Sequence, residues 1–69
     1  MPSLINKDNK SYSVSIQSGP TTHVFIISEN STKSNSIPSG ISKITLNRES
    51  IDSDGTKNIL IENGLLKKE

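Results

Sequence analysis

His23 is the residue best suited to acid–base chemistry, because it is the one histidine of the 69-residue chain. An unperturbed imidazole titrates close to neutral pH and could activate a serine nucleophile. Serine and aspartate are plentiful, but no motif places them beside His23 and there is no nucleophile-elbow pattern. We therefore assign no catalytic residue and expect a protein that is not an enzyme. His23 fits better as a strand-end residue that is solvated, hydrogen-bonded or in contact with a ligand.

Asp52, Asp54 and Gly55 have the spacing of part of a calcium-binding loop. Such a loop also needs an oxygen ligand before Asp52 and a bidentate glutamate after the glycine, where Ser50 and Ile61 stand. The chain has no cysteine, which excludes disulfides and thiolate metal sites. We expect a solvated acidic turn here, and neither a metal nor a cofactor.

Tyr12 and Phe25 are the only aromatic residues, and the formal net charge is +1. Proteins that bind single-stranded nucleic acid stack bases on exposed rings beside a basic groove. The lysines are scattered, and those near the end of the chain would also protect a strand edge from aggregation. An oligomeric ring that binds RNA or single-stranded nucleic acid is therefore an alternative that we do not favour, and a structural part of a larger assembly is another.

The strand that must position these residues is the run from Thr22 to Ser28, which contains four adjacent large apolar residues. These residues are β-branched or aromatic, and turn-forming residues stand on both sides of the run, which indicates a strand. Val24 and Ile26 fall on one face, whereas Phe25 and Ile27 fall on the other. Both faces should therefore be covered. Either later strands or another subunit would cover the side that carries Val24 and Ile26, and we assign these two residues to an oligomer interface.

The segment Ser11–Gln17 alternates apolar with polar residues, which predicts a strand with one solvated face. A turn at Gly19 and Pro20 would fold this strand back onto the apolar run. The register that follows pairs Ile16 with His23, Val14 with Phe25 and Tyr12 with Ile27. Pattern and turn agree on this hairpin, which strengthens the prediction.

A second hairpin is predicted near the end of the chain, where Asn63 and Gly64 lie between two apolar runs. Asn-Gly favours a type I′ turn, because both central residues need positive φ. The turn would pair Ile61 with Leu66. A terminal helix is the competing interpretation, but Asn-Gly in its middle would cost about 1 kcal/mol or more.

The remaining segments are predicted less directly. Residues 1–10 are polar apart from two aliphatic residues, so we expect a loose N-terminal segment or a short edge strand before a single small β domain over residues 11–69. Residues 40–48 fit a strand better than a helix. Residues 50–56 are expected to form a loop around the Asp-Gly pair.

Residues 29–39 form a polar loop that is long for so small a domain. Loops of this length are usually functional or disordered, so a mobile surface loop and a loop that grips a ligand or partner both remain open. On the second interpretation, the binding residues are His23, Lys33, Asn35 and Ile37.

These observations predict an all-β fold, a small open barrel or sandwich of about four to six short antiparallel strands completed by oligomerisation. A core this small rarely supplies more than about 3–5 kcal/mol, and without cysteine the remaining way to stabilise it is self-association. We expect a non-enzymatic homo-oligomer that holds a partner protein or small ligand at a subunit interface. We read neither a signal peptide nor a membrane span, so the expected location is the cytoplasm. The Asn, Lys and Ile bias suggests a low-GC bacterium or its virus, in which an inhibitor or ligand-sequestering role would fit.

Overall fold

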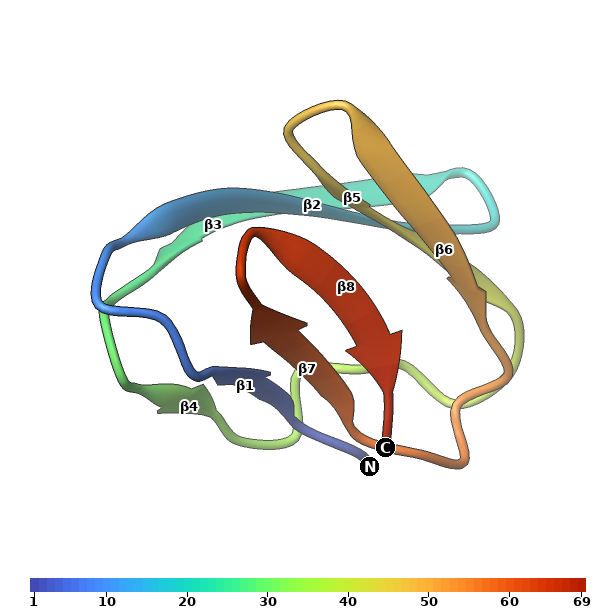
Figure 1. The fold of residues 1–69 in the computed structure, drawn as a ribbon. Helices are drawn as coiled ribbons and strands as arrows, with labels where there is room; N and C mark the ends of the chain where they lie inside the picture. The colour runs from blue at the N-terminus through green and yellow to red at the C-terminus, as the bar shows by residue number, and fades with distance from the viewer.

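The chain folds into two facing β-sheets without any helix (Figure 1). The computed structural model describes all 69 residues. The strands are β1 (Leu4–Asn6), β2 (Tyr12–Ser18), β3 (Thr21–Ile27), β4 (Thr32–Lys33), β5 (Ser42–Leu46), β6 (Glu49–Ser53), β7 (Ile59–Glu62) and β8 (Leu65–Lys68). Their orders are β4-β1-β7-β8 in one sheet and β3-β2-β5-β6 in the other. The predicted all-β fold is confirmed as a sandwich, although it has eight strands rather than four to six and β1 pairs with β7 in parallel. None of its segments is a helix that could span a membrane.

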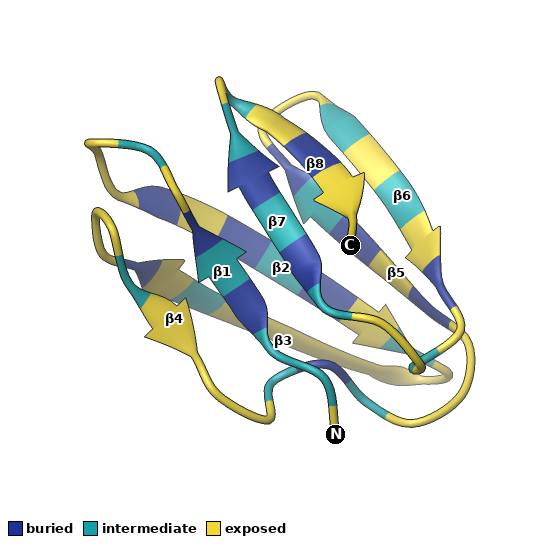
Figure 2. Cartoon of the chain, turned by 60° about the horizontal axis from the view of Figure 1, so that its bottom comes forward, coloured by how far each residue is buried: buried dark blue, intermediate teal, exposed yellow.

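One hydrophobic core lies between the two sheets and takes alternate side chains from most strands. Figure 2 shows this alternation as bands of buried and exposed residues along β2 and β5. The buried apolar residues are Leu4, Tyr12, Val14, Ile16, Ile27, Ile37, Ile44, Leu46, Ile59, Ile61 and Leu66. The period-two pattern read from Ser11–Gln17 therefore identified the correct inward face of β2.

The first hairpin, β2–β3, has the predicted register. Tyr12 is opposite Ile27, Val14 opposite Phe25 and Ile16 opposite His23. Gly19 has a φ of 60° at the first turn position, as a type II′ turn requires. The turn and the side-chain pattern thus select the same pairing.

The last hairpin, β7–β8, is also confirmed, with Ile61 opposite Leu66. Asn63 and Gly64 have φ values of 55° and 74°, both in the left-handed region that a type I′ turn requires. Near the turn, Lys67 Nζ lies 3.0 Å from Glu62 Oε1 in an exposed ion pair. Such pairs contribute little, so turn geometry and burial determine this hairpin.

The middle of the chain forms β5 as predicted, but the expected loop over 50–56 begins later. Asn47 adopts a φ of 55° and forms a tight turn with Arg48, after which β6 runs antiparallel to β5. Ile51 pairs with Ile44 and packs against the core. An asparagine at positive φ, together with one apolar residue, is therefore enough to make a strand from this largely polar segment.

Residues 1–10 differ from the expected loose segment, because β1 lies inside its sheet between β4 and β7. Leu4 is fully buried, and Asn6 is 1% exposed. The side-chain amide nitrogen of Asn6, Nδ2, donates hydrogen bonds to the backbone carbonyl oxygens of Lys10, at 2.8 Å, and Ser28, at 3.0 Å. A buried amide satisfied in this way holds a polar segment against the core.

Asp8 joins the N-terminal segment to the turn between β7 and β8. One carboxylate oxygen accepts hydrogen bonds from the Tyr12 hydroxyl at 2.6 Å and the Gly64 amide at 2.8 Å, and the other accepts from the Asn63 amide at 2.8 Å. These bonds, led by that from Tyr12, lower the pKa of Asp8, and the same contact raises the pKa of Tyr12.

The sandwich is bridged on one side only. There, the Glu49 carboxylate of β6 accepts a hydrogen bond from the Leu66 amide of β8 at 2.9 Å. On the opposite side β3 and β4 are the edge strands of the two sheets, and no ladder joins them (Figure 2). On this open side, the space between the two sheets is accessible from solvent.

The 29–39 loop is anchored by Ile37, which is 0% exposed and whose amide donates to the Pro2 carbonyl at 3.0 Å. We predict that Ile37→Ala lowers the free energy of unfolding by about 2–5 kcal/mol, because it leaves a cavity in the core. The matched control is Ile41→Ala: Ile41 is 82% exposed, and the change should be within about 0.5 kcal/mol. Urea denaturation measures both, and equal effects would contradict the anchoring role of Ile37.

Asp8 should make the fold sensitive to acid. Its pKa is lowered from 3.8 in the folded state, so its contribution to stability is fully present above that value and is lost as the pH falls through the lower folded pKa. We expect the melting temperature to fall in this acidic range and to fall less in Asp8→Asn. Asp52→Asn, at an exposed position on β6, is the control. A wild-type acid response in Asp8→Asn would refute this assignment.

Candidate functional site

A pocket of about 420 Å³ opens on the unbridged side of the sandwich, between β3 and the loop that contains β4. We call it the β3 pocket. It is lined by Ile16, His23, Phe25, Lys33, Ser34, Ser36 and Pro38. Pockets of this size with apolar walls and a few polar groups are typical sites for small ligands.

The walls of the β3 pocket combine apolar surface with hydrogen-bond donors. Ile16 is buried, and Phe25 and Pro38 are half-buried. Lys33 Nζ lies 5.7 Å from the centroid of the Phe25 ring, within the range of a cation–π contact. The structure has one ion pair, between Glu62 and Lys67. The ammonium group of Lys33 therefore has no carboxylate partner in the chain.

The pocket exists because two edge strands place residues that are distant in the sequence next to each other. Alternation along β3 turns His23 and Phe25 to the inner face, where their cross-strand partners are core residues of β2. Lys33 comes from β4, where it is opposite Leu4 of β1. The two sheets therefore each contribute one side of the pocket.

Hydrogen bonds hold the loop side of the pocket in place. Ser36 Oγ donates to the Lys33 carbonyl at 2.8 Å and accepts from the Leu4 amide at 3.2 Å. The Asn35 amide donates to Ser3 Oγ at 3.2 Å, and Asn35 has a φ of 56°. The loop is thus a defined turn tied to β1 and the segment before it.

The structure brings together two of the four ligand-contact residues named from the sequence. His23 and Lys33 line the same pocket, whereas Asn35 lies in the adjoining loop outside its lining. Ile37 is fully buried in the core, so its proposed contact with a ligand at the surface is corrected. A lone apolar residue in a polar loop inserts into the core because burial stabilises it, by about 1.5–3 kcal/mol for a large aliphatic side chain.

Phe25 is a pocket residue on the strand face that the sequence analysis expected to be covered. Its ring is only half-buried, because β3 is an edge strand rather than the covered strand that the apolar run suggested. The spacing of His23 and Phe25 already places both side chains on one face. Ser34, Ser36 and Pro38 carried no signal of their own, since serine and proline are common in any loop.

The polar groups of the β3 pocket do not form a nucleophile relay. Ser34 and Ser36 share the pocket with His23, but no aspartate or glutamate lines it.

The predicted acidic turn lies elsewhere. There, Asp54 accepts hydrogen bonds from the hydroxyl of Thr56 at 2.6 Å and from its backbone amide at 3.0 Å, and these bonds lower the pKa of Asp54. That carboxylate caps its own turn, and no cluster of acidic or histidine residues in the structure could hold a metal ion.

The outer face of β3 exposes the two residues assigned to an oligomer interface. Val24 is 68% exposed and Ile26 is 67% exposed. Their cross-strand neighbours on β2 are the small polar residues Ser15 and Ser13. The single chain therefore leaves uncovered the face that the sequence predicted to be covered.

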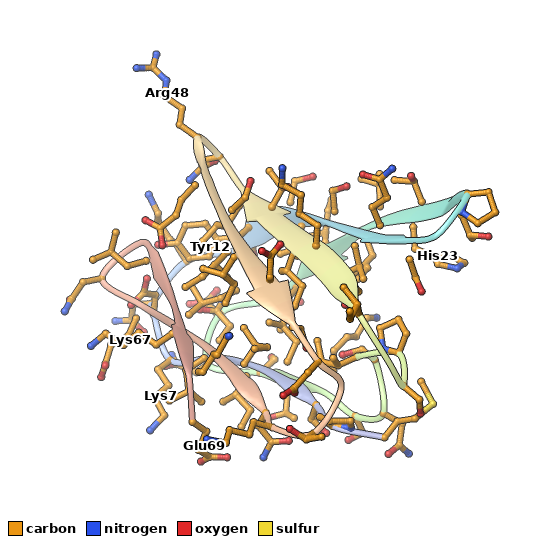
Figure 3. All side chains as sticks on the ribbon, turned by 90° about the vertical axis from the view of Figure 1, so that its right-hand side faces the viewer. Lys7, Tyr12, His23, Arg48, Lys67 and Glu69 are labelled. Atoms are coloured by element: carbon orange, nitrogen blue, oxygen red, sulfur yellow. The ribbon has the colours of Figure 1, made fainter.

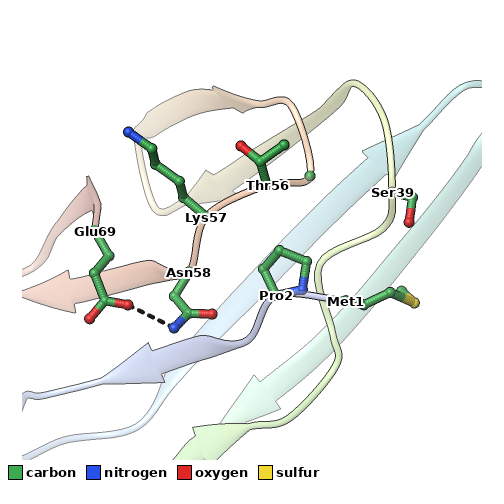
Figure 4. A pocket seen from close by; sticks show the side chains of 8 residues that line it. Met1, Pro2, Ser39, Thr56, Lys57, Asn58 and Glu69 are labelled. Atoms are coloured by element: carbon green, nitrogen blue, oxygen red, sulfur yellow. Dashed lines mark hydrogen bonds between the residues drawn. The ribbon is translucent and has the colours of Figure 1, made fainter.

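The largest pocket, about 540 Å³, lies where residues near both chain ends meet the β6–β7 connection (Figure 4). Its lining is mostly polar. Asn58 accepts from the Ser3 amide at 2.9 Å and donates to Glu69 Oε1 at 2.7 Å. These polar groups are engaged in holding the fold, and the pocket has no aromatic wall.

A third pocket, of about 360 Å³, is lined by Asp8 and Tyr12 together with their neighbours. The Tyr12 hydroxyl donates its hydrogen bond to the Asp8 carboxylate. This pocket also places a lysine near an aromatic ring, with Lys10 Nζ 5.2 Å from the centroid of Tyr12. The β3 pocket is the best candidate site, since it combines apolar walls and a lysine with no carboxylate in its lining, whereas Glu69 and Asp8 line the other two.

Comparison with known proteins gives no further assignment: no family model matches the chain, and neither does any curated protein or solved structure.

Proposed function

We propose that the chain is a non-enzymatic binding module that works as a homo-oligomer and holds a small ligand in the β3 pocket, at a subunit interface. The observation that carries this proposal is the position of the pocket. His23 and Phe25 line it, while Val24 and Ile26 of the same strand expose apolar surface on the other face. A strand that forms both a pocket wall and an apolar outer surface links ligand binding to assembly.

The pocket chemistry favours a ligand with a flat apolar body and a negative charge. Ile16, Phe25 and Pro38 offer apolar contact, and the Lys33 ammonium offers a charge-assisted hydrogen bond. No acidic side chain in the lining would repel an anion. Sequestration of such a ligand is the use that we propose, and a bacterial or viral setting and a cytoplasmic location remain predictions from the sequence.

No observation favours the nucleic-acid alternative. Figure 3 shows Arg48 projecting from the β5–β6 turn, with Lys7 and Lys67 on a different part of the molecule and His23 far from all three. A groove for single strands would need such cations in line beside exposed aromatic rings. Tyr12 is buried and Phe25 faces the β3 pocket.

The first experiment is native mass spectrometry of the protein purified from its source. We expect a dimer or larger assembly that retains a small ligand. A monomer that retains no ligand would contradict the proposal.

The second experiment probes the pocket directly by NMR titration with benzoate, a flat anion of matching chemistry. We expect saturable amide shifts at His23, Phe25 and Lys33. Lys33→Gln should weaken benzoate binding about threefold to tenfold, because it removes a charge that is partly screened by solvent. Lys43→Gln, at an exposed position on β5, should have no effect. Shifts confined to other surfaces, or equal effects of the two variants, would refute this site.

A further inference from the structure

β3 differs from the other three edge strands in having no charged residue. β4 is two residues long and contains Lys33, β6 contains Glu49 and Asp52, and β8 contains Lys67 and Lys68. Short length and charge prevent an edge strand from pairing with another chain. β3 is seven residues long and contains no aspartate, glutamate, lysine or arginine. The structure therefore protects three edges and leaves one able to pair.

The open side of β3 is formed by Thr22, Val24 and Ile26. A two-residue turn makes the flanking pair, Ser18 and Thr21, a hydrogen-bonded pair. Pairs then alternate along the hairpin, so odd-numbered residues of β3 direct their amides and carbonyls to β2. The even-numbered residues direct theirs away from the sheet, where β3 has no neighbour. Hydrogen-bonding capacity and exposed aliphatic side chains thus coincide on the same residues.

We propose that β3 pairs in antiparallel fashion with β3 of a second copy of this chain, about a two-fold axis through Val24. In this register Val24 is opposite Val24 of the partner subunit, and Thr22 is opposite Ile26 of the partner subunit. All three outward-facing residues then exchange backbone hydrogen bonds, and the whole of β3 overlaps. Shifting the register by two residues leaves part of the strand unpaired. The inference rests on the proposed function, in which the chain is a homo-oligomer.

This pairing also completes the β3 pocket. Directly opposite residues of an antiparallel pair lie on the same face of the sheet. His23 would therefore lie beside Phe25 of the partner subunit on the inner face, and Phe25 beside the partner's His23. Each pocket gains an aromatic ring that its own chain does not supply, and the two pockets adjoin across the seam. The partner copy is thus part of the ligand site.

Sedimentation velocity tests the interface with a matched pair of lysine variants. The wild type should be a dimer at micromolar concentration. Val24→Lys sets two like charges opposite each other, so the dimer should weaken by about tenfold or more. Ser50→Lys, on the outer face of the opposite edge strand β6, should remain a dimer. If Val24→Lys fails to fold by circular dichroism, Ile26→Lys replaces it. A monomeric wild type, or a dimer indifferent to both β3 variants, overturns the inference.

Single cysteine variants test the register, since the chain has no native cysteine. Opposite residues of a hydrogen-bonded pair have Cα atoms about 5.5 Å apart, within the range of about 4.4–6.8 Å for a disulfide. Val24→Cys should therefore cross-link to its own copy on oxidation, whereas Thr22→Cys and Ile26→Cys should cross-link only when mixed. A disulfide between two copies of Phe25→Cys, or between two copies of Thr22→Cys, would overturn this register.

A nuclear Overhauser experiment tests whether the partner's ring completes the pocket. In a mixture of isotope-labelled and unlabelled chains, an intermolecular nuclear Overhauser effect should join the His23 imidazole to the partner's Phe25 ring. Its absence in an otherwise dimeric sample overturns this arrangement. A dimer formed through another surface, with benzoate still bound at Lys33, would refute the β3 pairing and the interface position of the pocket, and would leave ligand binding in the β3 pocket standing. If the β3 dimer forms but does not bind benzoate, the proposed function is refuted and the β3 pairing stands.

Discussion

The structure depends on how its two sheets are joined: a hydrogen bond links their edge strands on only one side of the sandwich. Two small sheets enclose a core of eleven apolar residues, and β6 and β8 meet where Glu49 accepts the Leu66 amide. No such hydrogen bond joins β3 to β4, which are linked by the 28–31 connection and by the contact of Lys33 with the Phe25 ring. A domain this small buries a limited share of its surface. The β3 pocket follows from the open side of the sandwich, whereas Val24 and Ile26 are exposed because they lie on the outer face of β3.

Local signals in the sequence were sufficient to predict the β2–β3 and β7–β8 hairpins. At Gly19, and again at Asn63 and Gly64, the turn requires positive φ, and the residues that adopt it most readily stand in the right places. Alternation in Tyr12–Ser18 then fixed which face is buried, and a slip by one residue would have exposed it. Register was predictable here because turn chemistry and burial pattern agree over a few adjacent residues.

Long-range pairing and polar anchoring were not predictable in the same way. β1 pairs in parallel with β7, far away in the sequence, and no local pattern encodes that contact. Polar composition suggested that residues 1–10 are loose, whereas Asn6 and Asp8 use their polarity to bind the chain, through Lys10, Ser28 and the β7–β8 turn. The apolar run of β3 suggested a strand covered on both faces, but composition does not distinguish a central strand from an edge that is covered only in an assembly.

The candidate site shows the same division between local and long-range information. His23 and Lys33 were identifiable by residue type, but their proximity depends on the packing of β3 against β4, which the sequence does not reveal. Ile37 was assigned to the same site because it is apolar and lies in a polar loop, and that same property is the reason it enters the core. A single apolar residue in a polar loop is therefore weak evidence for a binding contact, because burial in the core accounts for it equally well. Within the strands, the exposed large apolar residues are Val24 and Ile26 of β3 and Leu65 of β8. Two of the three lie on the edge strand without charged residues, which is why we propose that β3 meets a partner.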